Sequence, residues 1–132
     1  MIHKGSCLCG GVAFEVHGDL RPVIFCHCTQ CRKQTGHYLA ATSCALKDFR
    51  LIRADSLAWY KASPAAKRGF CNLCGSTMFW QPEPPAQAIS ITPGVFDGPT
   101  GLKAEGHIYC ADKGDYYEIP THEGYRKQRW ED

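Results

Sequence analysis

The sequence predicts a mainly β fold in a single domain, and three observations support this. The chain has 132 residues, the size of one ordinary domain with one core. Short apolar or alternating runs recur along it, separated by Gly, Pro, Asp and Ser, as in strands joined by turns. No window keeps a 3.6-residue apolar period long enough for a substantial helix. We therefore expect one domain over residues 1–132, built from short strands.

The expected strands follow the apolar runs in chain order. They span residues 11–16, 22–28, 38–44, 49–52, 57–61, 68–71, 77–81, 88–92 and 107–110. A helical turn is expected over 29–36, directly after the strand that ends in "CHC". The segment "QPEPPAQ", at 81–87, is too rich in proline for a central strand, so it predicts a surface loop, and "TPGVFDGPTG", at 92–101, predicts a second one.

The functional prediction from the sequence rests on its cysteines. The chain has nine cysteines, and in a reducing compartment such an excess points to metal binding rather than to disulfides. Cys44 and Cys110 stand apart from the others, and we expect them to be small buried side chains on strands. The remaining seven fall into three tight groups: Cys7 and Cys9; Cys26, Cys28 and Cys31; and Cys71 and Cys74.

Two of these groups form pairs that together supply four ligands. Residues two apart in an extended strand point to the same face, so Cys7 and Cys9 should converge. The "CNLCG" motif of Cys71 and Cys74 is typical of a zinc knuckle, in which Gly75 permits a positive φ. Cys7, Cys9, Cys71 and Cys74 are therefore expected to form a closed structural zinc site.

The third group, Cys26, Cys28 and Cys31, has one ligand fewer than a closed site needs. Three protein ligands with an open fourth position are typical of a catalytic zinc. A soft, thiolate-rich site suits a sulfur ligand from solution, so we expect a small thiol as partner. A redox C-x-x-C motif, a disulfide framework and a metal-free thiol site are the alternatives, although neither a βαβ pattern nor a secretory signal accompanies these cysteines.

Charge and hydropathy argue against two classes of partner. Lys and Arg number 15 against 13 Asp and Glu, a net charge of +2, and the basic residues are scattered, so we expect no nucleic-acid partner. The start "MIHKGSCLCGG" lacks the apolar region of a signal peptide, and no apolar run approaches the ~20 residues that cross a bilayer. We expect no membrane partner and a cytoplasmic location.

Five segments together carry a resemblance to a known family. In order they are "GSCLCGGVAFEV", "CHCTQCRKQTGHY", "RGFCNLCGSTMFW", "GPTGLKAEGHIY" and "ADKGDYYEI". The chain resembles the glutathione-dependent formaldehyde-activating enzyme family, also called Gfa-like or centromere-protein-V-like, over nearly its whole length. The resemblance implies a β-tent-like fold of antiparallel sheets with two zinc sites, divided among the cysteines as the spacing divides them.

The resemblance also implies a reaction, the condensation of formaldehyde with glutathione to S-hydroxymethylglutathione, which is a carbon–sulfur lyase reaction in reverse. The three-cysteine zinc would take the glutathione sulfur as its fourth ligand and make thiolate available at neutral pH. A fold does not fix a substrate, so a zinc-stapled module that binds a thiol or a protein without catalysis is the alternative function. The sequence departs from the family pattern at "VFDGPTG", where Gly98 follows Asp97 in place of a second acid.

Five further residues are candidates for the three-cysteine site or its surroundings. His37 could donate a proton to the developing alkoxide, because imidazole exchanges protons near neutral pH. Arg32 and Lys33 follow Cys31 directly and could pair with the carboxylates of glutathione. His27 lies between two ligands but on the opposite face of the strand, so packing or a hydrogen bond is expected rather than ligation. Core packing is also expected for His107.

Overall fold

A computed structural model describes residues 1–131 and confirms the mainly β prediction. Strands hold 45% of the residues, and α- and 3₁₀-helices hold 12%. The chain forms two compact units. The first comprises Met1–Arg21 and Thr42–Gly101, and the second comprises Pro22–Ala41 and the chain from Leu102 onward. The expectation of one domain over residues 1–132 stays a prediction.

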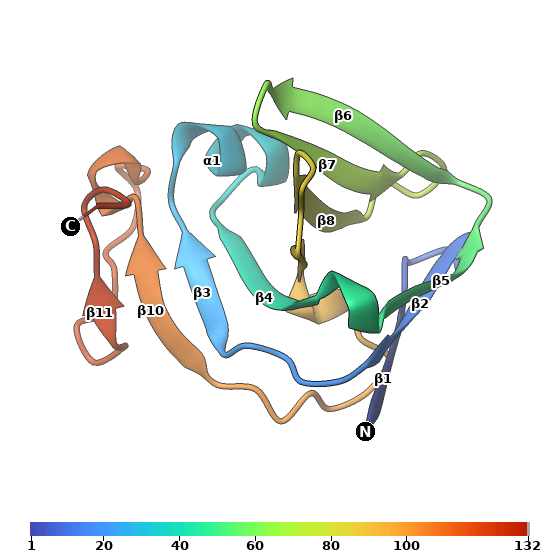
Figure 1. Cartoon of the computed structure of the whole chain (residues 1–132). Helices are drawn as coiled ribbons and strands as arrows, with labels where there is room; N and C mark the ends of the chain where they lie inside the picture. The colour runs from blue at the N-terminus through green and yellow to red at the C-terminus, as the bar shows by residue number, and fades with distance from the viewer. Residues whose placement is uncertain (132) are drawn as a thin grey trace. The chain divides into compact units, whose positions relative to one another are not determined.

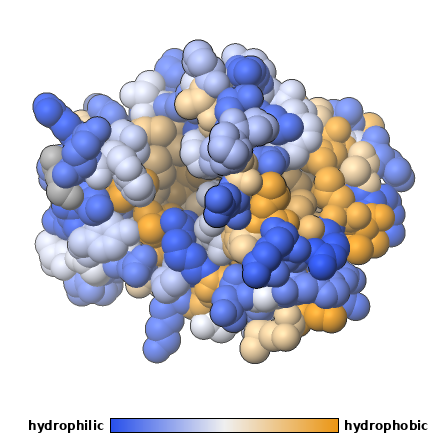
Figure 2. All heavy atoms as spheres, viewed as in Figure 1, coloured by the Kyte–Doolittle hydropathy of each residue, from blue (hydrophilic) through white to orange (hydrophobic). Residues whose placement is uncertain are grey.

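The first unit contains a three-stranded antiparallel sheet. Its strand order is β1 (Ile2–Ser6), β2 (Val12–His17) and β5 (Phe49–Ala54). Every second side chain of the central strand β2 is buried, as its alternating sequence predicts. The outer strand β5 is mostly exposed, and Figure 2 shows apolar side chains gathered at the side where β2 and β5 lie.

A second, antiparallel array of strands completes the first unit. Figure 1 shows β6, β7 and β8 side by side, with β7 in the middle. Strand β9 lies next to β8 and pairs on its other side with residues 42–45 of β4. The strand bounds are β4 Leu39–Ala45, β6 Leu57–Ser63, β7 Ala66–Cys71, β8 Thr77–Pro82 and β9 Ala88–Ile91.

The core of the first unit is formed by the buried faces of these strands. Phe14 is 1% exposed and meets the rings of Phe49, Phe79 and Phe96 at centroid distances of 5.6, 5.3 and 5.5 Å, which is the usual separation of packed aromatic pairs. The buried cluster comprises Cys7, Val12, Phe14, Val16, Cys44, Cys71, Met78, Phe79, Ile89 and Ile91. Two cysteines of the predicted four-cysteine site, Cys7 and Cys71, therefore belong to this core.

The second unit has a mixed sheet with one helix. Strand β3 (Val23–Cys26) pairs in parallel with β10 (Ala104–Ile108), which pairs in parallel with β11 (Tyr125–Arg126). On its other side, β3 pairs antiparallel with residues 39–41 of β4. Helix α1 (Thr29–Thr35) follows β3. The expected antiparallel pairing is present between β3 and β4, whereas β3 and β10 pair in parallel, because a long connection rather than a hairpin joins them.

Several boundaries differ from the sequence-based expectations. Strands β1 and β11 were not expected, since neither carries an alternating apolar run. The residues Cys7–Gly10 form a turn rather than an extended strand, and Cys110 lies in a 3₁₀-helix. The predicted helix is confirmed, and the proline-rich loop is confirmed over residues 83–87, whereas Gln81 and Pro82 belong to β8. The three 3₁₀-helices are η1 Leu46–Asp48, η2 Pro93–Val95 and η3 Cys110–Asp112. Within residues 1–131, no helix has the length and apolar character needed to span a membrane.

Candidate metal centres

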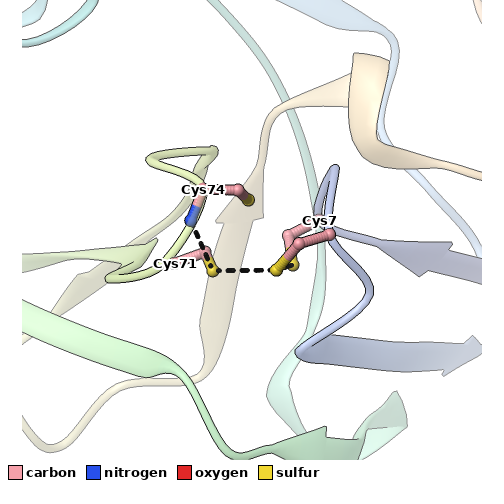
Figure 3. Close-up of side chains that lie close together, drawn as sticks. Cys7, Cys71 and Cys74 are labelled. Atoms are coloured by element: carbon pink, nitrogen blue, oxygen red, sulfur yellow. Dashed lines mark hydrogen bonds between the residues drawn. The ribbon is translucent and has the colours of Figure 1, made fainter.

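Four cysteines of the first unit converge from two turns. Cys7 and Cys9 lie between β1 and β2, whereas Cys71 and Cys74 lie at the end of β7 and in the turn before β8. Their four Sγ atoms all lie within 4.8 Å of one another. Figure 3 shows the side chains of Cys7, Cys71 and Cys74 pointing toward one another from separate strands and turns. The sequence-based pairing of these two motifs is therefore present in the structure as a cluster that could hold a metal ion.

The sulfur spacing in this cluster fits a tetrahedral ion. Cys9 Sγ lies 3.6 Å from both Cys7 Sγ and Cys71 Sγ. Four sulfurs placed ~2.3 Å from a zinc ion in a tetrahedron are about 3.8 Å apart, whereas a disulfide bond is about 2 Å long. All nine cysteines fall within residues 1–131, and none of them forms a disulfide bond. The disulfide-framework alternative is therefore wrong for this structure.

Two similar turns bring the four sulfurs together. In the first, the backbone N–H of Gly10 donates to the carbonyl of Cys7 at 3.1 Å, and Gly10 has φ +83°. In the second, the N–H of Gly75 donates to the carbonyl of Cys71 at 2.9 Å, and Gly75 has φ +79°. Such left-handed backbone favours glycine, so the expectation for Gly75 is confirmed. Because Cys7 and Cys9 belong to such a turn, the strand geometry expected for them is wrong although the sulfurs do meet.

Two serine hydroxyls contact sulfurs of this cluster. Ser56 Oγ lies 3.1 Å from Cys71 Sγ, and Ser76 Oγ lies 3.2 Å from Cys74 Sγ. The Ser76 hydroxyl lowers the pKa of Cys74 to about 5, and the Ser56 hydroxyl lowers the pKa of Cys71, because a hydrogen bond to a thiolate stabilises it. At Cys71 and Cys74, the environment therefore favours the thiolate form that metal binding requires.

The three cysteines of the second unit converge at the start of α1. They lie at the last residue of β3, at the N-cap of α1 and in its first turn. The backbone N–H of Cys31 donates to Cys28 Sγ at 3.3 Å. Cys31 is buried, and Cys26 and Cys28 are half-buried. The Sγ atoms of Cys26, Cys28 and Cys31 all lie within 4.8 Å of one another. Among residues 1–131, no fourth Cys, His, Asp or Glu ligand belongs to this group.

The three thiols also affect one another's ionisation. Hydrogen bonds from the thiols of Cys26 and Cys31 lower the pKa of Cys28 to about 2. The hydrogen bonds that Cys26 shares with Cys28 and Cys31 raise the pKa of Cys26 itself. A site with at least one stable thiolate and two neighbouring sulfurs could hold a soft metal ion, and its three donors leave a fourth position for another ligand.

The two histidines expected to pack in the core do lie there. His27 and His107 are each 1% exposed. Burial, followed by the nearby charge of His107, lowers the pKa of His27 to about 4, so His27 is neutral at pH 7. The His27 ring nitrogens contact Tyr117 and His107 rather than pointing to a metal cluster, in agreement with its expected orientation.

The structure places the predicted catalytic and cationic residues on or just after α1. His37 follows the helix, is exposed, and has Nδ1 2.7 Å from the hydroxyl of Tyr116. Arg32 is half-buried and Lys33 is exposed, both in the last turn of α1. They share a short segment with Cys31, but their roles toward a substrate remain predictions.

Tyr109 is a residue of the second unit that sequence analysis missed. It has φ +57°, a value uncommon for a residue other than glycine. Burial, followed by the negative charges of Cys26 and Cys28, raises its pKa, so its phenol lies within electrostatic range of the three-cysteine group. No sequence signal marks it, because Tyr109 follows a strand and resembles an ordinary core residue.

Asp97, where the sequence departs from the family pattern, belongs to the first unit. It accepts a hydrogen bond from the hydroxyl of Ser6 at 2.6 Å. With Gly98 and neighbouring residues it lines a shallow groove of about 230 Å³. The structure therefore gives Asp97 a local partner on the chain.

Comparisons with known proteins find a matching family model and similar proteins. The family model described as "Glutathione-dependent formaldehyde-activating enzyme" matches residues 2–112. A Schizosaccharomyces pombe protein described as an uncharacterized lyase is 25% identical over 117 residues, which cover 89% of this chain and 85% of that protein. A crystal structure of a Rhodobacter sphaeroides protein is similar with a TM-score of 0.64 and 26% identity, covering 79% of this chain and 98% of that one.

Proposed function

Because the chain belongs to the glutathione-dependent formaldehyde-activating enzyme family, we propose that it is a zinc-dependent carbon–sulfur lyase. Its substrate would be an adduct of glutathione and an aldehyde, of the S-hydroxymethylglutathione type. The similarity to a protein described as a lyase supports the reaction class. The observation that carries the proposal is the group of Cys26, Cys28 and Cys31, which offers three thiol ligands and, among residues 1–131, no fourth.

The two cysteine groups would have different tasks. The four-cysteine group would hold a structural zinc, because four protein ligands close a tetrahedral site. The three-cysteine group would hold the second zinc. A zinc ion bound there would supply an open coordination position at which the pKa of an incoming thiol is lowered.

The residues on and after α1 would handle the rest of the reaction. In the condensing direction, the sulfur of glutathione attacks the aldehyde carbon, a carbon–sulfur bond forms, and the carbonyl electrons move to oxygen. His37 would protonate that oxygen and, in the reverse direction, remove the same proton. If the Tyr116 hydroxyl donates to His37 Nδ1 across their 2.7 Å contact, the ring proton lies on Nε2 and is available for this transfer.

The cations of α1 would hold the substrate. Glutathione carries two carboxylates, and Arg32 can pair with a carboxylate in a bidentate manner. Lys33, exposed beside it, would add attraction for the second carboxylate. We place this activity in the cytoplasm, because nine cysteines without a disulfide bond among residues 1–131 suit a reducing compartment.

The test is the rate at which formaldehyde and glutathione exchange with their adduct, measured by two-dimensional exchange NMR with ¹³C-formaldehyde. Since the reaction also proceeds without catalyst, the enzyme-free rate is subtracted. We expect the zinc-loaded protein to accelerate exchange and Cys28→Ser to abolish the acceleration. Cys110→Ser, which changes a cysteine outside both groups, should keep it. An exchange rate unchanged by the wild-type protein would contradict the proposal.

One observation favours the alternative of a zinc-stapled binding module. Leu8 and Leu73, each in one of the two turns that carry the four-cysteine group, are 88% and 77% exposed. Large apolar side chains so fully exposed suit contact with another protein. Under this alternative, Cys28→Ser would leave partner binding unchanged, whereas Leu8→Ser together with Leu73→Ser would weaken it.

A further inference from the structure

A buried network of hydrogen bonds lies beside the peptide that joins Cys26 to Cys28. His27 Nε2 lies 2.8 Å from His107 Nδ1, and His107 Nε2 lies 2.6 Å from Glu123 Oε2. On the other side of its ring, His27 Nδ1 lies 2.6 Å from the hydroxyl of Tyr117. The four side chains therefore form one continuous network, called here the His27 network.

The carboxylate at one end fixes the direction of one hydrogen bond in this network. A carboxylate only accepts, so His107 donates from Nε2 to Glu123. In the state in which the His107 ring is neutral, His107 accepts at Nδ1 and His27 donates from Nε2. His27 in turn accepts at Nδ1 from the hydroxyl of Tyr117. Each of the buried ring nitrogens has a partner, as buried polar groups require.

Ring packing and backbone contacts hold His27 from further directions. The His27 ring lies against the Tyr38 ring at a centroid distance of 4.5 Å, and His107 stacks on Phe25 at 4.9 Å. The backbone N–H of His27 donates to the carbonyl of Ile108 at 3.0 Å. Both the main chain and the side chain of His27 are therefore fixed within the second unit.

We propose that the His27 network is a support for the three-cysteine metal site, with His107 and Glu123 as positioning residues. His27 is the only residue between Cys26 and Cys28, so whatever fixes His27 also fixes the direction in which the two sulfurs leave the backbone. A ligand pair held in place before the metal arrives loses less conformational freedom on binding. This inference rests on the proposed function only in requiring that the three-cysteine group binds metal.

Simple core packing accounts poorly for these residues. An apolar side chain would fill the same volume without the cost of burying polar atoms. Glu123 and His107 instead form a salt-bridge geometry with His107 1% exposed. Partners one step removed from metal ligands commonly change metal affinity 10- to 100-fold when they are mutated.

The experiment measures zinc affinity at each cysteine group by competition with a chromophoric chelator. As the chelator concentration rises, the wild type should release its two zinc ions in two steps. The step that is missing in Cys28→Ser belongs to the three-cysteine group. His107→Phe keeps a ring against Phe25 and removes two hydrogen bonds. Glu123→Ala changes only the partly exposed end of the network, and Glu123→Gln keeps an acceptor oxygen. His17→Phe, which removes an exposed histidine paired with Glu15 at 2.8 Å, is the matched control.

We expect His107→Phe and Glu123→Ala to weaken zinc binding at the three-cysteine group about tenfold or more. The four-cysteine group should keep its affinity in every variant, and Glu123→Gln and His17→Phe should resemble the wild type. Unchanged affinity at the three-cysteine group in both variants, or an equal loss at both groups, would overturn the inference. A wild-type protein that releases only one zinc ion per chain would instead overturn the metal site on which the proposed function depends, and the inference with it.

Discussion

Cys44 is a buried thiol that belongs to neither metal cluster. It is 4% exposed, and burial, followed by the charge of Asp48, raises its pKa to about 11 from the usual 9.0. In the unfolded chain the thiol ionises near pH 9, whereas in the folded protein it stays protonated until about pH 11. The unfolded state therefore binds fewer protons in that window, so this group makes the protein less stable as pH rises from 9 to 11.

Between pH 9 and pH 11, we expect the Cys44 thiol to lower the free energy of unfolding by about 2 kcal/mol. Urea unfolding of wild type and Cys44→Ala at pH 8 and pH 11 measures it, since other titrating groups cancel in the difference between the two proteins. The wild type should lose more stability than the variant. An equal loss in both proteins would show that the Cys44 thiol ionises in the folded state as it does in the unfolded one.

The residues that sequence analysis identified belong to short motifs in which cysteines lie two or three residues apart, even where two such motifs meet across 62 residues, as Cys9 and Cys71 do. The spacing of Cys26, Cys28 and Cys31 shows a cluster directly, because a turn of six residues brings the sulfurs together. Glu123 and Ser56 gave no such signal. Glu123 meets His107 and Ser56 meets Cys71 across 16 and 15 residues, and a single carboxylate or hydroxyl is common on any surface.

At the scale of single elements, helix α1 depends on its two caps. Cys28 is the N-cap and accepts from the backbone N–H of Cys31. Gly36 is the C-cap, with φ +83°, and its N–H donates to the carbonyl of Arg32 at 2.8 Å. The helix was predictable because "TQCRKQTG" ends in the glycine that a left-handed cap favours. The parallel pairing of β3 with β10 was not, since strand partners distant in sequence leave no local pattern.

Gly36→Ala should destabilise the protein by about 1 kcal/mol, because a side chain is strained in left-handed backbone. An added Cβ would meet no atom within 4 Å, so the cost is conformational and not steric. Gly94→Ala is the matched control, since a Cβ at Gly94 also meets nothing within 4 Å and its φ is not in the left-handed region. Chemical denaturation of the two variants measures the difference. Equal stabilities would contradict the role of Gly36 as a cap.

At the scale of the whole molecule, each compact unit contains one cysteine group. The four-cysteine group lies in the first unit and includes two core residues, Cys7 and Cys71. The three-cysteine group lies in the second unit, with Cys26 and Cys28 only half-buried. The division of the cysteines into these two sets was predictable from their spacing. The division of the chain into two units was not predictable, because each unit combines segments that are distant in sequence.

This division predicts different costs for losing a ligand from each group. Cys71→Ser should lower the free energy of unfolding by about 4 kcal/mol or more, as loss of a core metal site can. Cys28→Ser should cost less than Cys71→Ser, because Cys28 lies outside the core, is only half-buried, and is replaced by a favourable helix N-cap. Thermal unfolding of the zinc-loaded variants provides the comparison. A Cys28→Ser protein as unstable as Cys71→Ser would contradict the assignment of a structural zinc to the four-cysteine group and a reactive zinc to the three-cysteine group.

We propose that the chain holds two zinc ions, one of them with an open position for a thiol. The most direct measurement is zinc content per chain by elemental analysis, with zinc-edge absorption spectra recorded with and without glutathione. We predict two ions in wild type and in Cys110→Ser, one in Cys28→Ser, and an added sulfur neighbour when glutathione is present. One ion in wild type and in Cys28→Ser alike, with no response to glutathione, would contradict it.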